Sequence, residues 1–464
     1  MNARTKSPRT RGGGRLGELR SRAARLRPLT LLTRGVGALV ALALLYLVVI
    51  TVHEILDAAV SRDVRVVGGE GTPAGAPAVG EPRFLEQLSV LTPVAMTGGN
   101  RVEALLFGDT VFDRMEADIR GARRAVAVQM YYCEPGRVAR RIAAALAAKA
   151  QEGVPVYFLW DTFGCGSLGG DYFDTLRRAG VRVAAFRPIH WYTLHRAQHR
   201  SHVRAVVVDG VVGYTGGTGF ADKWLNGPTG LAGWRDTSVR FSGPAVRELA
   251  AVFAAAWTEA TGVLLDGPDL FPPPAAPAAG GGATAGLVYS STTLGTSEAE
   301  RFLALTIAGA RRTLWVTNSY FLPNRAFRDF LRRAARRGVD VRVLVPGERI
   351  DVKILLYAGQ AHYEELMQAG IRVWEYRGRM LHAKTIVADG AWTAIGTLNL
   401  DNRSLRLNDE ATLAIYDAGL GAAMDSVFLR DLRSAREVRL EEFRRRPWAN
   451  RAWELLATRL ASFL

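Results

Sequence analysis

Residues 202–210, HVRAVVVDG, and residues 382–390, HAKTIVADG, repeat one order of chemical types. Each stretch begins with a histidine, has a basic residue two positions later, and closes on Asp-Gly after an apolar run. Residues two apart in a strand share a face, so each histidine is expected beside its basic neighbour. These pairs are His202 with Arg204 and His382 with Lys384.

The Asp-Gly dipeptides that end both stretches predict hairpin turns. Each is followed by a second strand-like run, VVGYTGG after the first and AWTAIGT after the second. Asp209 and Asp389 lie an odd number of residues from their histidines and therefore point to the opposite face. We expect these two aspartates to brace the turns rather than to orient their own histidine.

The sequence around the two stretches is duplicated. Basic pairs, apolar strands and Ala/Arg/Leu-rich helices recur in the same order, with offsets of similar size. The matching ranges are 123–134 with 311–322, 152–160 with 337–345, and 173–186 with 363–376. Each half reads β-α-β-α-β, which predicts an α/β fold with helix-covered sheets and many parallel pairings. The long repeat favours two fused domains over a solenoid.

Carboxylates occupy matching positions after the two hairpins. Asp236 closes Trp-Arg-Asp before the strand SVRF, and Glu410 closes Asn-Asp-Glu before another apolar strand. A histidine that works as a base or nucleophile needs an acceptor to orient its ring. Asp236 and Glu410 are the candidates for that role.

Two histidines and two cations that face one another suit a phosphodiester. One imidazole attacks phosphorus, and the other protonates the leaving alcohol and then deprotonates the incoming one. Arg204, Lys384 and Asn399 are expected to hold the non-bridging oxygens. No cluster of metal-ligating acids accompanies the motif, so neither a metal nor another cofactor is expected.

Composition limits the remaining possibilities. The chain has 464 residues, 48% hydrophobic and 22% charged, and a net charge of +16. Ten of its 60 basic residues, against one acid, lie in residues 1–34, so the body is only mildly basic and no specific nucleic acid is expected. Cys133 and Cys165 are too few for a disulfide-rich scaffold and either pair or remain free thiols.

An apolar segment precedes the globular part. Residues 35–52 contain no charge and, as a helix, cover roughly 27 Å, enough to cross a bilayer core. The basic leader 1–34 places the N-terminus in the cytoplasm by the positive-inside rule. We therefore expect a single-pass protein of the cell membrane with an extracytoplasmic catalytic part, joined to its anchor by a flexible tether, residues 53–98.

The paired motifs and the duplicated halves resemble the phospholipase D superfamily, and within it membrane-anchored bacterial cardiolipin synthase-like proteins. The resemblance implies two α/β halves related by a pseudo-twofold axis, with His202 as nucleophile and His382 as acid/base. The candidate catalytic residues are His202, Arg204, Asp209, His382, Lys384 and Asp389, with Asn399, Ser404, Asp236 and Glu410 as supporting or phosphate-binding residues. The expected regions are a first half at 99–265, a linker at 266–286, a second half at 287–440 and a C-terminal amphipathic helix at 441–464.

Two positions depart from the family pattern. Arg204 stands where the family usually has lysine, and Gly219 stands where the first copy often has a phosphate-binding asparagine. The implied activity is phosphatidyl transfer on a phosphatidylglycerol-like phospholipid. A phospholipase D hydrolase, an exported nuclease and an inactive envelope protein remain open, as do the acceptor alcohol and the oligomeric state.

Overall fold

The computed structural model describes residues 35–42, 44–46, 48–49, 76–192, 197–226, 233–273, 280–291 and 297–461. The chain divides into two compact units, Met1–Arg62 and Asp63–Leu464. In the first unit, the described residues from 35 to 49 are helical and exposed. Among the described residues, no helix is both long and apolar enough to cross a membrane. The leader and the rest of the expected 35–52 span lie outside the described residues.

The second unit contains two halves whose strands follow the same order, apart from an additional last strand in the second half. The first half comprises β1 (Thr97–Leu105), α3 (Gly108–Gly121), β2 (Val126–Met130), α4 (Arg137–Gln151), β3 (Val156–Asp161), η2 (Gly166–Leu168), α5 (Gly170–Arg178), β4 (Arg182–Phe186), β5 (Ala205–Val208), β6 (Val212–Gly216), η4 (Asp222–Trp224), β7 (Ser238–Ser242) and α6 (Val246–Thr261). The second half comprises β8 (Ala283–Ser290), α7 (Glu298–Gly309), β9 (Thr313–Thr317), α8 (Arg325–Arg336), β10 (Asp340–Pro346), α9 (Lys353–Gln360), α10 (Tyr363–Gln368), β11 (Arg372–Tyr376), β12 (Thr385–Ala388), β13 (Trp392–Gly396), α11 (Asn402–Arg406), β14 (Glu410–Tyr416), α12 (Ala418–Leu432) and β15 (Ala435–Glu437).

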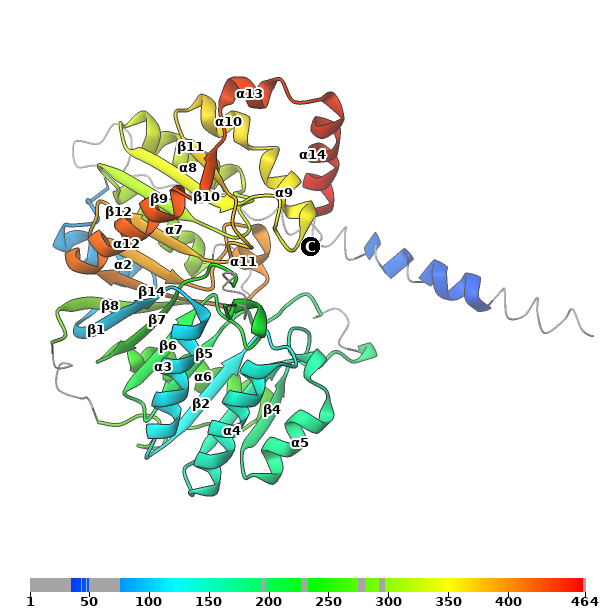
Figure 1. The fold of residues 1–464 in the computed structure, drawn as a ribbon, viewed down its shortest axis with the longest axis vertical. Coiled ribbons are helices and arrows are strands. Elements are labelled where there is room, and N and C mark those ends of the chain that lie inside the picture. The colour runs from blue at the N-terminus through cyan, green and yellow to red at the C-terminus, as the bar shows by residue number, and fades with distance from the viewer. Residues whose placement is uncertain are drawn as a thin grey trace, which may run out of the picture. The chain divides into compact units, whose positions relative to one another are not determined.

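Within the described residues the strands form one sheet in the order β15-β11-β10-β9-β12-β13-β14-β8-β1-β7-β6-β5-β2-β3-β4. Apart from the additional edge strand β15, the order reads the same way outward from the β8–β1 junction, so the duplication predicted from sequence is present in the fold. Figure 1 shows the first half in cyan and green below the second half in yellow and orange. The two copies of the motif therefore occupy equivalent places on either side of the junction.

Parallel pairing is confined to part of each half. β2, β3 and β4 are parallel, as are β9, β10 and β11. The hairpins β5–β6 and β12–β13 continue each sheet with antiparallel pairs. Both Asp-Gly turns have positive φ at two successive residues, 56° and 67° in the first and 55° and 68° in the second, as type I′ hairpins require.

Helices cover both faces of the sheet. α3, α4 and α5 pack on one face of the first half, and α7, α8 and α10 pack on one face of the second. On the other face, a shared core receives α6 and α12 together with strands of both halves. This continuous apolar core, which includes Ala127, Phe253, Val387 and Met424, fixes one half against the other.

Several boundaries differ from those expected. The predicted tether 53–98 is folded in its later part: α2 (Pro82–Leu91) buries Phe84 and Leu88 in the core of the second half. Strand β8 begins within the predicted linker, because Ala283 and Ala285 are buried in the shared core. The C-terminal segment forms α13 (Leu440–Arg444) and α14 (Trp448–Ala461) rather than one helix.

Candidate active site

The two motif histidines lie where the halves meet. His202 precedes β5 and His382 precedes β12, and both side chains are buried. Each histidine segment runs beside the other half: His202 N–H donates to the Asp409 carbonyl (2.9 Å), and His382 N–H donates to the Arg235 carbonyl (2.7 Å). The residue just before each candidate carboxylate thus binds the backbone of the opposite histidine.

As a result, each histidine pairs with the carboxylate of the opposite half. His202 Nδ1 lies 2.9 Å from Oε2 of Glu410, and His382 Nδ1 lies 2.8 Å from Oδ2 of Asp236. A carboxylate accepts hydrogen bonds, so both Nδ1 atoms carry their proton and both Nε2 atoms present a lone pair. Neither half therefore contains a complete site by itself.

Each Nε2 atom faces the cation of its own motif. Both terminal nitrogens of Arg204 lie 3.2 Å from His202 Nε2, and Lys384 Nζ lies 2.9 Å from His382 Nε2. Arginine and protonated lysine only donate, which fits unprotonated Nε2 atoms. The four side chains bring two imidazoles and two cations into one buried site.

Burial and neighbouring positive charge lower the pKa of both histidines. Burial, with the positive charges of Arg204 and Lys384, lowers the pKa of His202 well below its ordinary value. Burial and the Lys384 ammonium lower the pKa of His382 to about 4, although Asp236 opposes this shift. Both imidazoles are therefore neutral at neutral pH.

The pKa values of the two carboxylates shift in opposite directions. Burial raises the pKa of Glu410 to about 7. Burial also acts to raise the pKa of Asp236, but the charge and hydrogen bond of His382 outweigh it and hold that pKa below its ordinary value. Burial lowers the pKa of Lys384 to about 7. Asp236 is thus the more firmly ionised of the two acids, and it faces His382.

Asp209 and Asp389 lie in the turns, where their carboxylates contact backbone amides rather than the histidines. The Asp209 carboxylate accepts from the backbone amides of Arg123, Arg124 and Ala125, at 2.7–3.1 Å. Asp389 accepts from the equivalent amides of residues 311–313 at the start of β9. These contacts support the bracing role and give no support for counting the two aspartates among the catalytic residues.

Asn399 and Ser404 lie on the Glu410 side of the site. Asn399 Oδ1 accepts from Ser319 Oγ (3.2 Å), and its Nδ2 lies 3.4 Å from Ser404 Oγ. The hydroxyls of Thr397 and Ser404 both hydrogen-bond to Glu410. This half of the site thus has a polar network that can orient Glu410.

The first half lacks that network and uses an indole instead. Trp224, which corresponds to Ser404 in the duplication, donates from Nε1 to Oδ2 of Asp236 (2.8 Å). A side chain at Gly219, which corresponds to Asn399, has no room: its Cβ would lie 2.6 Å from the Tyr132 carbonyl oxygen. The packing of Tyr132 and Trp224 around this position therefore favours the glycine that departs from the family pattern.

Aromatic rings enclose both histidines, and the motifs alone did not identify them. Tyr131 meets the His202 ring edge-on (4.8 Å between centroids) and lies under the Arg204 guanidinium. Trp224 and Trp234 each lie 5.6 Å from the His382 ring. Tyr131 could have been found from the sequence, because it is one of the aromatic residues that end the repeated strand in residues 123–134.

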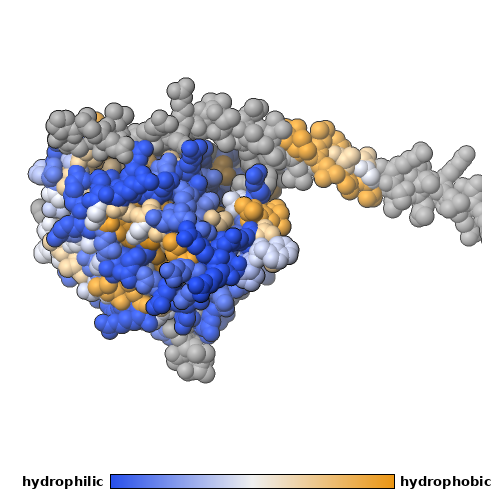
Figure 2. Space-filling view, turned by 90° about the horizontal axis from the view of Figure 1, so that it is seen from above, coloured by the Kyte–Doolittle hydropathy of each residue, from blue (hydrophilic) through white to orange (hydrophobic). Residues whose placement is uncertain are grey.

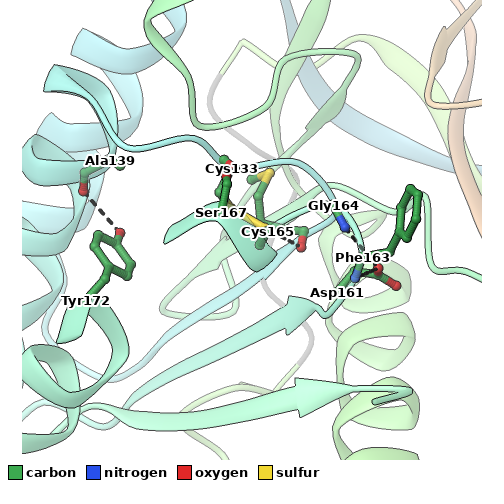
Figure 3. Close-up of a disulfide and its surroundings, with 9 residues drawn as sticks. Cys133, Ala139, Asp161, Phe163, Gly164, Cys165, Ser167 and Tyr172 are labelled. Atoms are coloured by element: carbon green, nitrogen blue, oxygen red, sulfur yellow. Dashed lines mark hydrogen bonds between the residues drawn. A yellow bond between two sulfur atoms is a disulfide. The ribbon is translucent and has the colours of Figure 1, made fainter. Parts of the chain in front are cut away.

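Cys133 and Cys165 form a buried disulfide, which settles the pairing that the sequence left open (Figure 3). The bond ties the end of β2 to the loop after β3, where Ser167 Oγ donates to the Cys133 carbonyl (3.0 Å). A pocket of about 480 Å³ lies over this region, lined by Tyr131, Tyr132, Glu134, Pro135, Phe163, Gly164 and Ser167. Through Tyr131, the pocket adjoins His202.

Comparisons with known proteins identify the family of the chain. Residues 303–432 match the family model described as cardiolipin synthase, PLD-like domain. Cardiolipin synthase A of Pseudomonas putida is 36% identical over 350 residues, which cover 74% of this chain and 71% of that protein. Cardiolipin synthase of Halalkalibacterium halodurans is 31% identical over 373 residues, covering 80% of this chain and 73% of that protein.

A solved structure shares the fold. Phosphatidylserine synthase of Haemophilus influenzae superposes with a TM-score of 0.61, at 14% identity, over 83% of this chain and 98% of its own. This likeness concerns the fold alone, whereas the curated relatives match most of the sequence. The chain belongs to the cardiolipin synthase family of proteins with phospholipase D-like domains.

Proposed function

We propose that the chain is a membrane-anchored phosphatidyltransferase of the cardiolipin synthase type, working through a phosphohistidine on His202. Membership of the family and the shared fold support phosphatidyl transfer. The observation that carries the proposal is the crossed arrangement of His202–Glu410 and His382–Asp236 around Arg204 and Lys384.

His202 is the proposed nucleophile. Its Nδ1–H is bound by Glu410 and its Nε2 lone pair is free of a proton, the state that attacks phosphorus. Its pKa is held well below the ordinary value by burial and by both cations, so it resists protonation. Nε2 forms the bond to phosphorus as the bond from phosphorus to the first alcohol oxygen breaks.

His382 is the proposed acid/base, and the firmly ionised Asp236 beside it supports this role because it stabilises an imidazolium. The entering phosphodiester adds negative charge next to His382 and raises its proton affinity. The protonated ring then gives its proton to the leaving alkoxide. It takes one back from the second alcohol, whose oxygen displaces His202 from phosphorus.

Arg204 and Lys384 are the proposed phosphate ligands. Both are buried beside an Nε2 atom, where a charged donor in a low-dielectric site stabilises the developing negative charge strongly. Asn399 adds an amide on the second side only, since Gly219 leaves no side chain on the first. The two halves are thus proposed to hold the phosphate unequally.

Product analysis tests this function. Purified full-length protein is supplied with phosphatidylglycerol, and free glycerol, the doubly phosphatidylated product and phosphatidic acid are measured. Transfer predicts glycerol and the doubled lipid in equal amounts, both lost in His202→Ala and His382→Ala. Glycerol with an equal amount of phosphatidic acid, and no doubled lipid, would make water the acceptor and the protein a hydrolase, and DNA cleavage without lipid turnover would refute the proposal.

Residues 35–52 are proposed to anchor the chain, with the catalytic unit outside the cytoplasm. The support is the uncharged apolar run after a leader with ten basic residues. A topology reporter fused after residue 66 should be active only in the extracytoplasmic compartment. A cytoplasmic signal would overturn the proposed orientation.

A further inference from the structure

The C-terminal helix α14 docks on the body by an unusual side. It packs along α9 and buries Glu454 and Ala457, and the Arg446 guanidinium holds the Glu454 carboxylate with two bonds of 2.7 Å. Amphipathic helices normally turn their apolar stripe to the core. Here a small residue and an ion pair make the contact.

The apolar side of α14 is consequently exposed. Its large members are Trp448, Trp453, Leu455, Leu456 and Leu460, defined here as the α14 face. Trp448 is 81% exposed and Leu455 is 69% exposed, although both are bulky. At 3.6 residues per turn, the five side chains fall within about half of the helix circumference. Figure 2 shows hydrophobic side chains gathered at the edge of the body where Figure 1 places α14.

The charges around the α14 face have one sign. Arg451 and Arg459 are the exposed charged side chains of the helix, and its acid, Glu454, is buried against Arg446. Tryptophan rings beside leucines and arginines suit the boundary of a bilayer, where the ring spans headgroup and acyl regions and arginine meets lipid phosphates. A helix face that packs into a protein core does not require exposed arginines beside its apolar residues.

The α14 face is also connected to the active site. Leu356 of α9 packs with Ile350 and Met380, and this cluster contacts Trp234 and Tyr320. Trp234 and Tyr320 are in ring contact with His382. Helix α9, against which α14 packs, therefore forms part of the wall of the active site next to His382.

We propose that the α14 face lies on the surface of an anionic bilayer and holds the His382 side of the site beside it. The choice of lipid as partner rests on the proposed function, but the binding itself requires no catalysis. An interfacial helix of this kind sits about 5–10 Å into the headgroup and acyl boundary. The surface would then act as a second membrane contact, separate from residues 35–52.

A site-specific label tests the proposal in the full-length protein. Cys133 and Cys165 are joined and buried, so a cysteine introduced as Leu456→Cys takes an environment-sensitive dye selectively. Asn450→Cys, exposed on the same helix away from the α14 face, is the matched control. Each labelled protein is reconstituted in nanodiscs of phosphatidylglycerol and phosphatidylcholine, with or without nitroxide-labelled lipid.

The proposal predicts that the label at 456 emits at shorter wavelength and loses most of its emission to nitroxide lipid, whereas the label at 450 does neither. The difference should shrink in nanodiscs of phosphatidylcholine alone. Equal, weak quenching at both positions would overturn the proposal. Energy transfer between labels at 456 on different chains, without lipid quenching, would assign the face to a second copy and overturn it too. Because no turnover is measured, failure here is distinct from failure of phosphatidyl transfer.

Discussion

Asp236→Asn is expected to slow the reaction in a way that depends on the leaving group. Oδ2 of Asp236 accepts from both His382 Nδ1 and Trp224 Nε1 at 2.8 Å, and Oδ1 accepts from the Thr237 amide at the same distance. An asparagine cannot accept on both sides, so either the Thr237 amide loses its acceptor or both His382 and Trp224 do. The negative charge that stabilises protonated His382 also disappears.

The magnitude follows from these contacts. A buried hydrogen bond to a charged group contributes about 1.5–3 kcal/mol, which corresponds to about 10- to 150-fold in rate. That loss applies to a lipid with an ordinary alcohol leaving group, which needs a proton from His382. A nitrophenyl ester needs little protonation, so its adduct-forming step should lose much less in Asp236→Asn.

The assay is the burst of nitrophenol release compared with turnover of phosphatidylglycerol, on the same preparation of variant. Comparing two substrates within one variant cancels any loss of folded protein. Glu410→Gln is the matched control, because it acts on His202 and should slow both substrates alike. An equal loss on both substrates in Asp236→Asn would refute the assignment of His382 as the acid.

Three further predictions concern the cations and the disulfide. Arg204→Ala should lose about 100-fold or more in kcat/KM, because a charged donor contributes about 2.7–4 kcal/mol to the stability of the transition state. Arg204→Lys should retain most activity. Equal activity in both variants would mean that the position is vestigial. Because burial lowers the pKa of Lys384 to about 7, its ammonium form predominates only below that pH. KM for lipid should therefore rise as pH increases through about 7, and Lys384→Arg should flatten the profile; an unchanged wild-type KM from pH 6 to 8 would contradict this. Replacing Cys133 and Cys165 together by serine should lower the free energy of unfolding by about 3–4 kcal/mol, because the disulfide closes a loop over 32 residues. Urea titrations that coincide with those of the wild type would show that the bond does not stabilise the fold.

Much of the site was predictable because the motif repeats. The spacing in HVRAVVVDG and HAKTIVADG indicated the hairpins, the bracing aspartates and the pairing of each histidine with its cation. Matching positions also singled out Asp236 and Glu410. Sequence could not say which carboxylate serves which histidine, because that depends on the exchange of segments between halves.

Other features depend on packing that no local pattern records. Trp224 donates to Asp236, and a side chain at Gly219 would collide with the Tyr132 carbonyl and crowd the Trp224 ring; a motif shows neither fact. The tether was expected because residues 67–82 are rich in proline and glycine. The amphipathic pattern that lets Phe84 and Leu88 pack on the second half was missed, and so the later part of that segment is folded.

Mass spectrometry of quenched protein tests the central claim of a covalent intermediate on His202 most directly. The wild type and His382→Ala are mixed with a phosphatidyl nitrophenyl ester, stopped in acid-free denaturant and digested. The account predicts a phosphatidyl adduct on the peptide that contains His202, and none in His202→Ala. An adduct on His382 would reverse the assigned roles, and the absence of any adduct while the wild type turns over would contradict the two-step mechanism.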